Sequence, residues 1–307
     1  MASRLWRFEV YQLRPFLILC IGGTLLSCGE KSTDSATDVG VCATGDTIVG
    51  VISSITHARR EDGVVWGFDI DGMNSINTDP NGCYKEDLSD PNGNTGIDNA
   101  FSALIPALES TEAVALESLV QQSINNGNLL LMVEISGVDN WQNDDCVDVS
   151  IWRGQGTPLI GTDGSLMLHQ SFFKDNTMPN SHIDGMQIVD GKLEARPMNV
   201  ELPVQVLDES LNFKLTEGGL YIELTEDGHM SGFFTGALPI QTLTDITTLP
   251  DVNLPEIVQN LVASAADLYP QEDGTCAAIS VAFEYNAIPA FFTLEEEYAT
   301  DNSMETE

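Results

Sequence analysis

Oxygen-bearing side chains gather in one stretch of the chain, Trp66 to Asn99, with the sequence WGFDIDGMNSINTDPNGCYKEDLSDPNGNTGIDN. Few of its residues could join an apolar core. A loop of about thirty residues without helix or strand periodicity is uncommon in a compact domain unless it is functional or disordered. Carboxylate and amide oxygens spaced between Gly and Pro residues suit calcium, which takes about six to eight oxygen ligands. The stretch therefore predicts an ordered loop that binds calcium in a structural role.

The candidate metal ligands are the acidic and amide side chains spaced along this loop: Asp69, Asp71, Asp79, Asn81, Asp87, Asp90, Asn92, Asn94 and Asp98. Two tetrapeptides, 79–82 and 90–93, share the sequence Asp-Pro-Asn-Gly, and each fits a type I turn. The same residues could form a metal-free array of turns in which each Asp bonds its own backbone. The repetition and the many donors favour calcium, because a divalent cation offsets repulsion among crowded carboxylates.

Residues 90–99, DPNGNTGIDN, resemble the calcium loops of EF-hand and thrombospondin type 3 repeats. The resemblance implies alternating oxygen ligands at Asp90, Asn92 and Asn94. The stretch departs from the EF-hand because Thr95 stands where that loop has Gly, and no bidentate Glu ends it. We therefore expect a calcium loop of a different pattern from a true EF-hand.

The N-terminus has the features of an exported protein. Arginines precede an apolar run, Pro15 to Leu26, that is too short to span a bilayer as a mature helix. Leu25-Leu26-Ser27-Cys28 then matches the lipobox of bacterial lipoproteins, and this resemblance implies that Cys28 is acylated and anchors the mature chain in a membrane. Gly29, not Asp, follows the Cys, which in the enterobacterial sorting rule permits delivery to the outer membrane. The alternative is an ordinary signal peptide that is cleaved without lipid.

Charge and composition exclude some partners. The net charge of −35, from 12 basic and 47 acidic residues, argues against nucleic acid and against electrostatic docking on anionic lipid. A hydrophobic content of 42% is enough for a substantial core, so general disorder is not expected. The acidity fits both a solvated exported surface and the binding of multivalent cations.

Four cysteines remain once Cys20 leaves with the signal and Cys28 carries lipid: Cys42, Cys83, Cys146 and Cys276. In an oxidising exported compartment they predict two disulfides, for which three connectivities are possible. Sequence does not choose among these. We favour pairing the second with the fourth and the first with the third, which would tie the acidic loop to the C-terminal strands. The cysteine and histidine spacing does not match a zinc site.

The order of elements predicts a β-rich α+β fold, an antiparallel sandwich or curved sheet covered by a few helices. We divide the chain into a lipoprotein signal peptide (1–27), a flexible tether (28–46), one globular domain (47–293) that contains the acidic loop 69–98, and an acidic disordered tail (294–307).

Expected strands include Thr47–Thr56, Val64–Phe68, Leu129–Ser136, Cys146–Trp152, Cys276–Tyr285 and Ala287–Phe292. Between Leu129 and Gly236 the turn signals Asp190-Gly191, Gly218-Gly219 and Asp227-Gly228 predict a meander. Three helices are expected: Asn99–Leu108 with Asp98 as N-cap, one from Ser110 or Thr111 to Gly127, and Asn253–Leu268.

Taken together, the lipobox, the F-D-x-D-G motif of Phe68–Gly72, Cys83 and the G-I-D-N motif of Gly96–Asn99 resemble uncharacterised lipoproteins of myxobacteria-like bacteria. The resemblance implies an envelope protein and brings no activity with it.

Catalytic motifs are scarce in this sequence. It has no G-x-S-x-G, H-E-x-x-H or P-loop, and Ser171-Phe172-Phe173-Lys174 matches S-x-x-K without a K-T-G partner. The first expectation is therefore a non-catalytic, calcium-stabilised lipoprotein for binding or envelope structure. A second is a carbohydrate-binding or carbohydrate-cleaving surface protein, with Trp66, Trp141 and Trp152 as stacking candidates. A third is a carrier of an apolar ligand, enclosed by the meander and the Asn253–Leu268 helix. Expected partners are the membrane, through the lipid, and a glycan or another envelope protein.

Overall fold

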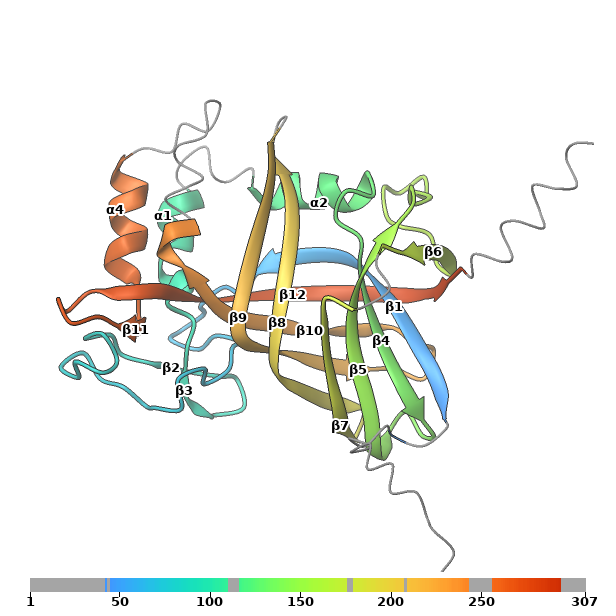
Figure 1. Ribbon diagram of the computed structural model, residues 1–307, viewed down its shortest axis with the longest axis horizontal. Coiled ribbons are helices and arrows are strands. Elements are labelled where there is room, and N and C mark those ends of the chain that lie inside the picture. The colour runs from blue at the N-terminus through green and yellow to red at the C-terminus, as the bar shows by residue number, and fades with distance from the viewer. Residues whose placement is uncertain are drawn as a thin grey trace, which may run out of the picture. The chain divides into compact units, whose positions relative to one another are not determined.

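The long strands pair with one another in chain order, and the last pairs with the first. In the computed structural model these strands are β1 (Asp46–His57), β4 (Leu131–Val138), β5 (Asn143–Gln155), β7 (Ser181–Val189), β8 (Lys192–Val206), β9 (Glu209–Leu224), β10 (Met230–Pro239) and β12 (Cys276–Phe292). Each neighbouring pair is antiparallel, and β12 returns to β1, so the sheet closes into an eight-stranded barrel (Figure 1).

The structure describes Cys42 and residues 45–109, 116–175, 179–206, 209–242 and 256–293. The predicted signal peptide, Cys28, nearly all of the tether and the acidic tail lie outside these residues, as does Asn253 of the third expected helix. All described residues belong to one unit of the chain that begins at Val39. Within this part of the chain, none of the helices is both long enough and apolar enough to cross a bilayer.

The shorter elements surround the barrel. They are β2 (Leu88–Ser89) paired with β3 (Thr95–Ile97), β6 (Gln170–Lys174) beside β5 and β12, β11 (Leu268–Pro270) beside β12, the 3-10 helix η1 (Ala100–Ala103), and the helices α1 (Ile105–Glu109), α2 (Leu116–Asn125) and α4 (Glu256–Ala265). The fold is thus β-rich with few helices, as the sequence indicated. Of the two expected arrangements, sandwich or curved sheet, the sandwich is not observed. The sheet curves until β1 pairs with β12, which closes it into a barrel and leaves no free edge between the first and last strands.

Alternation along the strands separates the inside of the barrel from the outside. Leu220, Ile222 and Phe234 belong to the main core cluster, whereas the intervening Tyr221 and Phe233 form a separate aromatic cluster. Since successive side chains of a strand point to opposite faces, the first group lines the interior and the second covers the outer wall. Helix α2 contacts both β1 and β8, which lie on opposite sides of the barrel, and so it lies across one end.

Two sequence expectations about β9 and β12 change. Gly218-Gly219 was expected as a turn but lies inside β9, where the register with β8 and β10 shifts. A Cβ on Gly219 would lie 2.9 Å from the Phe68 ring, so glycine here permits a close approach of the acidic loop to the barrel wall. The two strands expected at Cys276–Tyr285 and Ala287–Phe292 form the single strand β12.

Other strands and helices also differ from the bounds expected from the sequence. Val64–Phe68 forms only isolated bridges, to Ser89 and Asp98 among others. The expected helix Asn253–Leu268 is α4 in its described part, and Leu268 already belongs to β11. The Asp190-Gly191 hairpin is confirmed, with positive φ at both residues as a type I′ turn requires.

Both favoured disulfides are confirmed. Cys42 bonds to Cys146, with their Cα atoms 5.4 Å apart, and Cys83 bonds to Cys276, with theirs 6.2 Å apart. Each link closes a long segment of chain, 104 and 193 residues apart in sequence.

Candidate functional site

The candidate site forms where two segments of the acidic loop run side by side. The N–H of Asp98 donates to the carbonyl of Phe68 at 2.9 Å, and the two residues form an antiparallel bridge. The F-D-x-D-G and G-I-D-N motifs therefore meet, a pairing that sequence reasoning did not foresee. Gly96 has φ +79°, and a Cβ there would lie 2.6 Å from the Met73 carbonyl oxygen. Only glycine fits this close approach.

Three carboxylates converge at this point. Side-chain oxygens of Asp69, Asp71 and Asp98 lie within 4.8 Å of one another. One oxygen of each is held by the backbone: Asp69 Oδ1 accepts from Gly72 N–H at 2.7 Å, and Asp71 Oδ1 from Met73 N–H at 2.9 Å.

Asp98 is held more firmly than the other two. Its Oδ2 accepts from the N–H groups of Ile70 and Asp71, at 2.6 and 3.2 Å. The second oxygen of each of the three carboxylates has no hydrogen-bond donor among the described residues. The backbone thus orients all three groups and leaves one oxygen of each free for another ligand.

Burial makes this arrangement costly when all three groups are ionised. Asp98 is only 2% exposed, and burial raises its pKa to about 8, with a smaller contribution from the charge of Asp71. Burial likewise raises the pKa of Asp71, helped by the charges of Asp69 and Asp79. The site therefore favours either a proton or a cation.

Asp87 lies close enough to influence this group. Burial raises the pKa of its carboxyl, and the charges of Asp71 and Asp69 raise it further. Its Oδ2 accepts from Ser75 N–H at 2.5 Å, which ties together two parts of the loop that are 12 residues apart in sequence.

The remaining predicted ligands make turns instead of joining the triad. Asp79 Oδ1 accepts from Asn81 N–H at 2.9 Å. Asp90 Oδ1 accepts from the N–H groups of Asn92 and Asn94, and its Oδ2 from their side-chain amides. Both Asp-Pro-Asn-Gly segments are thus turns closed by their own Asp, as the metal-free alternative describes, while the triad lies elsewhere in the loop.

Asp98 is not the helix cap that the sequence suggested. Asn99 caps η1, with its Oδ1 accepting from Ser102 N–H at 3.3 Å, while its amide donates to the Trp66 carbonyl at 3.1 Å. The cap moves by one residue because the Asp98 carboxylate is already engaged by Ile70 and Asp71.

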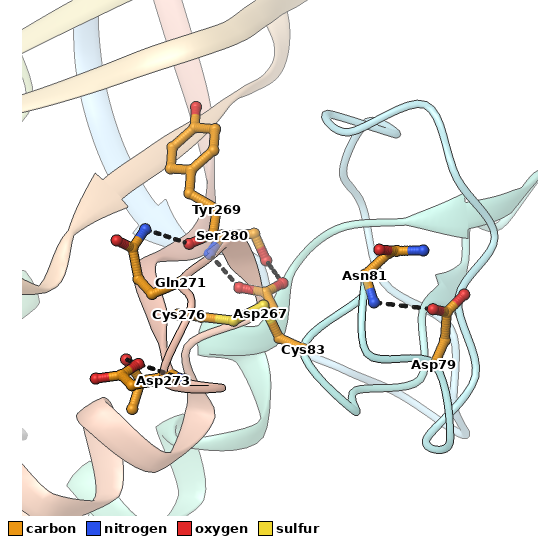
Figure 2. The surroundings of a disulfide bond; sticks show 10 residues. Asp79, Asn81, Cys83, Asp267, Tyr269, Gln271, Asp273, Cys276 and Ser280 are labelled. Carbon is orange, nitrogen blue, oxygen red and sulfur yellow. Dashed lines mark hydrogen bonds between the residues drawn. A yellow bond between two sulfur atoms is a disulfide. The ribbon is translucent and has the colours of Figure 1, made fainter.

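The Cys83–Cys276 disulfide ties the loop to the start of β12 (Figure 2). Beside it, buried Asp267 accepts from Ser280 N–H at 2.7 Å and from the Ser280 hydroxyl, which in turn accepts from Ala100 N–H at 2.8 Å. Burial raises the pKa of Asp267 to about 6. This chain of contacts joins η1 to the barrel and holds the loop from its C-terminal side.

An aromatic cluster lies on the other side of the loop. Trp66 stacks on Tyr221 and Phe233, with ring centroids 6.4 and 5.6 Å apart, and Phe68 packs on Phe233 at 5.0 Å. The Arg196 guanidinium lies 4.9 Å from the centre of the Phe68 ring. Sequence reasoning named Trp66 as a stacking candidate and Phe68 as part of a motif, but it did not bring Arg196, Tyr221 and Phe233 to them, because these three come from the distant strands β8, β9 and β10.

The two other tryptophan candidates and the S-x-x-K match lie in or beside the barrel wall, away from the acidic loop. Trp152 is buried under the Lys174 ammonium, 3.7 Å from the ring centre, and its N–H donates to Glu134 at 2.6 Å. Trp141 lies beside the β7–β8 turn at Gly191. Ser171 and Lys174 are on the strand β6, not at the start of a helix.

Comparison with known proteins adds no identity: no family model matches the chain, and neither a curated protein nor a solved structure shows significant similarity to it.

Proposed function

We propose that this chain is a lipid-anchored protein of the bacterial envelope, directed to the outer membrane by its sorting signal, whose non-catalytic barrel domain is stabilised by calcium at Asp69, Asp71 and Asp98. The observation that supports the metal site is that the two oxygens of each carboxylate differ in their hydrogen bonding. One oxygen of each is fixed by backbone N–H groups, and the other is left without a donor.

Calcium fits this donor set better than a softer metal. Carboxylate oxygens are hard ligands, and calcium completes its shell with backbone carbonyls and water. Bound there, it would supply positive charge that offsets the cost of burying the ionised Asp98, the main cause of its raised pKa, and also the smaller repulsion from Asp71. Its role would be to order the loop against the barrel.

The test is a calcium titration of the purified exported chain in detergent, followed by its melting temperature. Calcium at about 100 times its Kd should stabilise the fold by about 2.7 kcal/mol, a rise in melting temperature of roughly 5–11 °C. Asp98→Asn should abolish the rise. Asp62→Asn is a matched control, because Asp62 is exposed, outside the triad, and has a positive φ that Asn tolerates. An equal calcium response in both variants would contradict the proposed site.

The lipid anchor is tested separately. Intact mass should show acyl chains on Cys28, and Cys28→Ser should release the protein from the membrane fraction. A wild-type chain that is processed without added lipid mass would refute the anchor and leave the calcium site untouched.

A second candidate function, carriage of an apolar ligand, is favoured by the closed barrel with its apolar interior. Barrels of about eight strands either fill with side chains or hold one small ligand. Phe234, Leu220 and Ile222 are fully buried in this interior, so a ligand would have to share it with them. Helix α4, the lid that the sequence suggested, instead contacts β12 and η1. Native mass spectrometry of protein from its source membrane would reveal a retained lipid, and repeated ligand-free spectra would exclude this role.

A further inference from the structure

The outer wall of the barrel carries a groove beside the acidic loop. A hollow of about 240 Å³ is lined by Trp66, Asn94, Glu194 and Arg196 among others. A second, broader hollow continues from it along β8, because Asn92, Glu194 and Tyr221 line both. We call the two hollows together the Trp66–Glu194 groove. Their combined size falls in the range of small-molecule sites, about 300–1,000 Å³.

The floor of the groove is aromatic and fixed by the sheet. Glu194 pairs with Tyr221, and Tyr221 with Phe233, so these side chains form one row across β8, β9 and β10. The half-buried Trp66 ring lies against this row, inclined by only 15° to Tyr221 and 23° to Phe233. The groove therefore offers an apolar face that is rigid and partly open to solvent.

The rim of the groove presents unpaired acceptors. The Glu194 carboxylate is exposed and has no hydrogen-bond or ion-pair partner among the described residues. The side-chain N–H groups of Asn92 and Asn94 donate to Asp90, and their side-chain oxygens accept no hydrogen bond from the described residues.

The rim also presents donors. The Trp66 ring N–H has no acceptor within the described part of the chain. Arg196 is exposed and its guanidinium lies over Phe68; among the described residues its one hydrogen bond runs from Nη1 to the Asp69 carbonyl at 3.4 Å. Free donors and free acceptors thus surround one aromatic face.

This chemistry decides among ligand classes. An anion would meet Asp69, Asp90 and Glu194 on a chain of net charge −35. An organic cation would compete with the Arg196 guanidinium, which already occupies the face of Phe68. A neutral sugar suits both the aromatic floor and the polar rim, because its C–H face stacks on an aromatic ring and each hydroxyl both donates and accepts.

We propose that the Trp66–Glu194 groove binds a neutral carbohydrate. The inference goes beyond the proposed calcium-stabilised envelope protein by giving it a ligand, and of the metal triad only Asp69 lines the groove. Carbohydrate binding and the calcium response can therefore fail independently.

The test is an array of neutral, sialylated and sulfated oligosaccharides probed with the full chain, followed by calorimetric titration of the best neutral glycan. We expect binding to neutral members, and Trp66→Ala should weaken it at least about tenfold. Glu194→Gln should weaken it about fivefold through loss of a charged acceptor. Glu272→Gln makes the same charge change outside the groove and should leave the affinity unchanged.

Folding and calcium are controlled in the same experiment. Trp66 packs on the barrel, so Trp66→Phe, which keeps an aromatic face, should retain most of the binding if Trp66→Ala proves unstable. Titrations in calcium and in chelator separate the two proposals: glycan binding without a calcium-dependent melting shift sustains the groove alone. A blank array, a preference for anionic glycans, or unchanged affinity in folded Trp66→Ala and Glu194→Gln would overturn the groove proposal.

Discussion

The backbone N–H of Ile70 donates a hydrogen bond of 2.6 Å to Asp98 Oδ2, across 28 residues of sequence. This bond holds a buried carboxylate where the two motifs of the acidic loop meet. Burial nevertheless raises the pKa of Asp98 to about 8, although the bond itself favours the ionised form. At neutral pH the loop therefore folds most easily when Asp98 carries a proton or faces a cation.

The stability of the calcium-free protein should fall as pH rises from about 5 to about 8. The folded-state pKa of Asp98 lies above its unfolded value, so in this window the folded state binds more protons and loses stability as they leave. Thermal melts in chelator across this range measure the slope. Asp98→Asn should flatten it, and an equally steep fall in that variant would assign the effect to other groups.

Gly96→Ala should destabilise the protein by about 1–3 kcal/mol and weaken its calcium response. A Cβ would strain the positive φ and would also collide with the Met73 carbonyl. Gly93→Ala is the matched control, because Gly93 also has a positive φ, +88°, but open space around it. Urea unfolding of both variants measures the difference. Equal losses would mean that the approach of Met73 does not matter.

Replacing Cys83 and Cys276 together by Ser should cost about 2–5 kcal/mol of stability. It should also free the acidic loop from β12, so that limited proteolysis cuts within 69–98 before it cuts the barrel. The corresponding change at Cys42 and Cys146 removes the other link and should leave the loop protected. Cleavage of the loop at the same rate in both double variants would argue against this anchoring.

Phe234→Ala should cost about 3–5 kcal/mol, because the ring is buried inside the barrel and its loss leaves a cavity. Phe291→Ala removes the same ring from an exposed position on β12 and should change stability by only about 0.5 kcal/mol or less. Chemical unfolding of the two variants tests whether the interior assignment of β10 is right.

Much of the strand pattern could be predicted because it depends on local alternation and turn residues. Cys146–Trp152 was expected as a strand and lies within β5, where Val147, Val149 and Ile151 are buried, as are the intervening Asp148 and Ser150. Barrel closure could not be predicted in this way, because the pairing of β1 with β12 joins residues more than two hundred positions apart. Nothing in either strand alone distinguishes a closed barrel from a sandwich.

The candidate site, too, could be predicted only where it depends on local sequence. Composition located the acidic loop, and the Asp-Pro-Asn-Gly repeats indicated turns. Which carboxylates converge depends on the bridge between Phe68 and Asp98, and this bridge has no signature in spacing. The glycine inside β9 was misread for a related reason: Gly219 makes room for the Phe68 ring, a tertiary demand that looks like a turn signal in sequence.

Closure of the barrel by its first and last strands has a consequence for biogenesis. Gly50–His57 cannot find its partner until Phe283–Pro289 has been synthesised. Contacts of such high sequence separation form late, after the entropy of a very long loop has been lost. The edge of β1 that pairs with β12 therefore stays open while the rest of the barrel is made, and during this time it can pair with the strands of other chains.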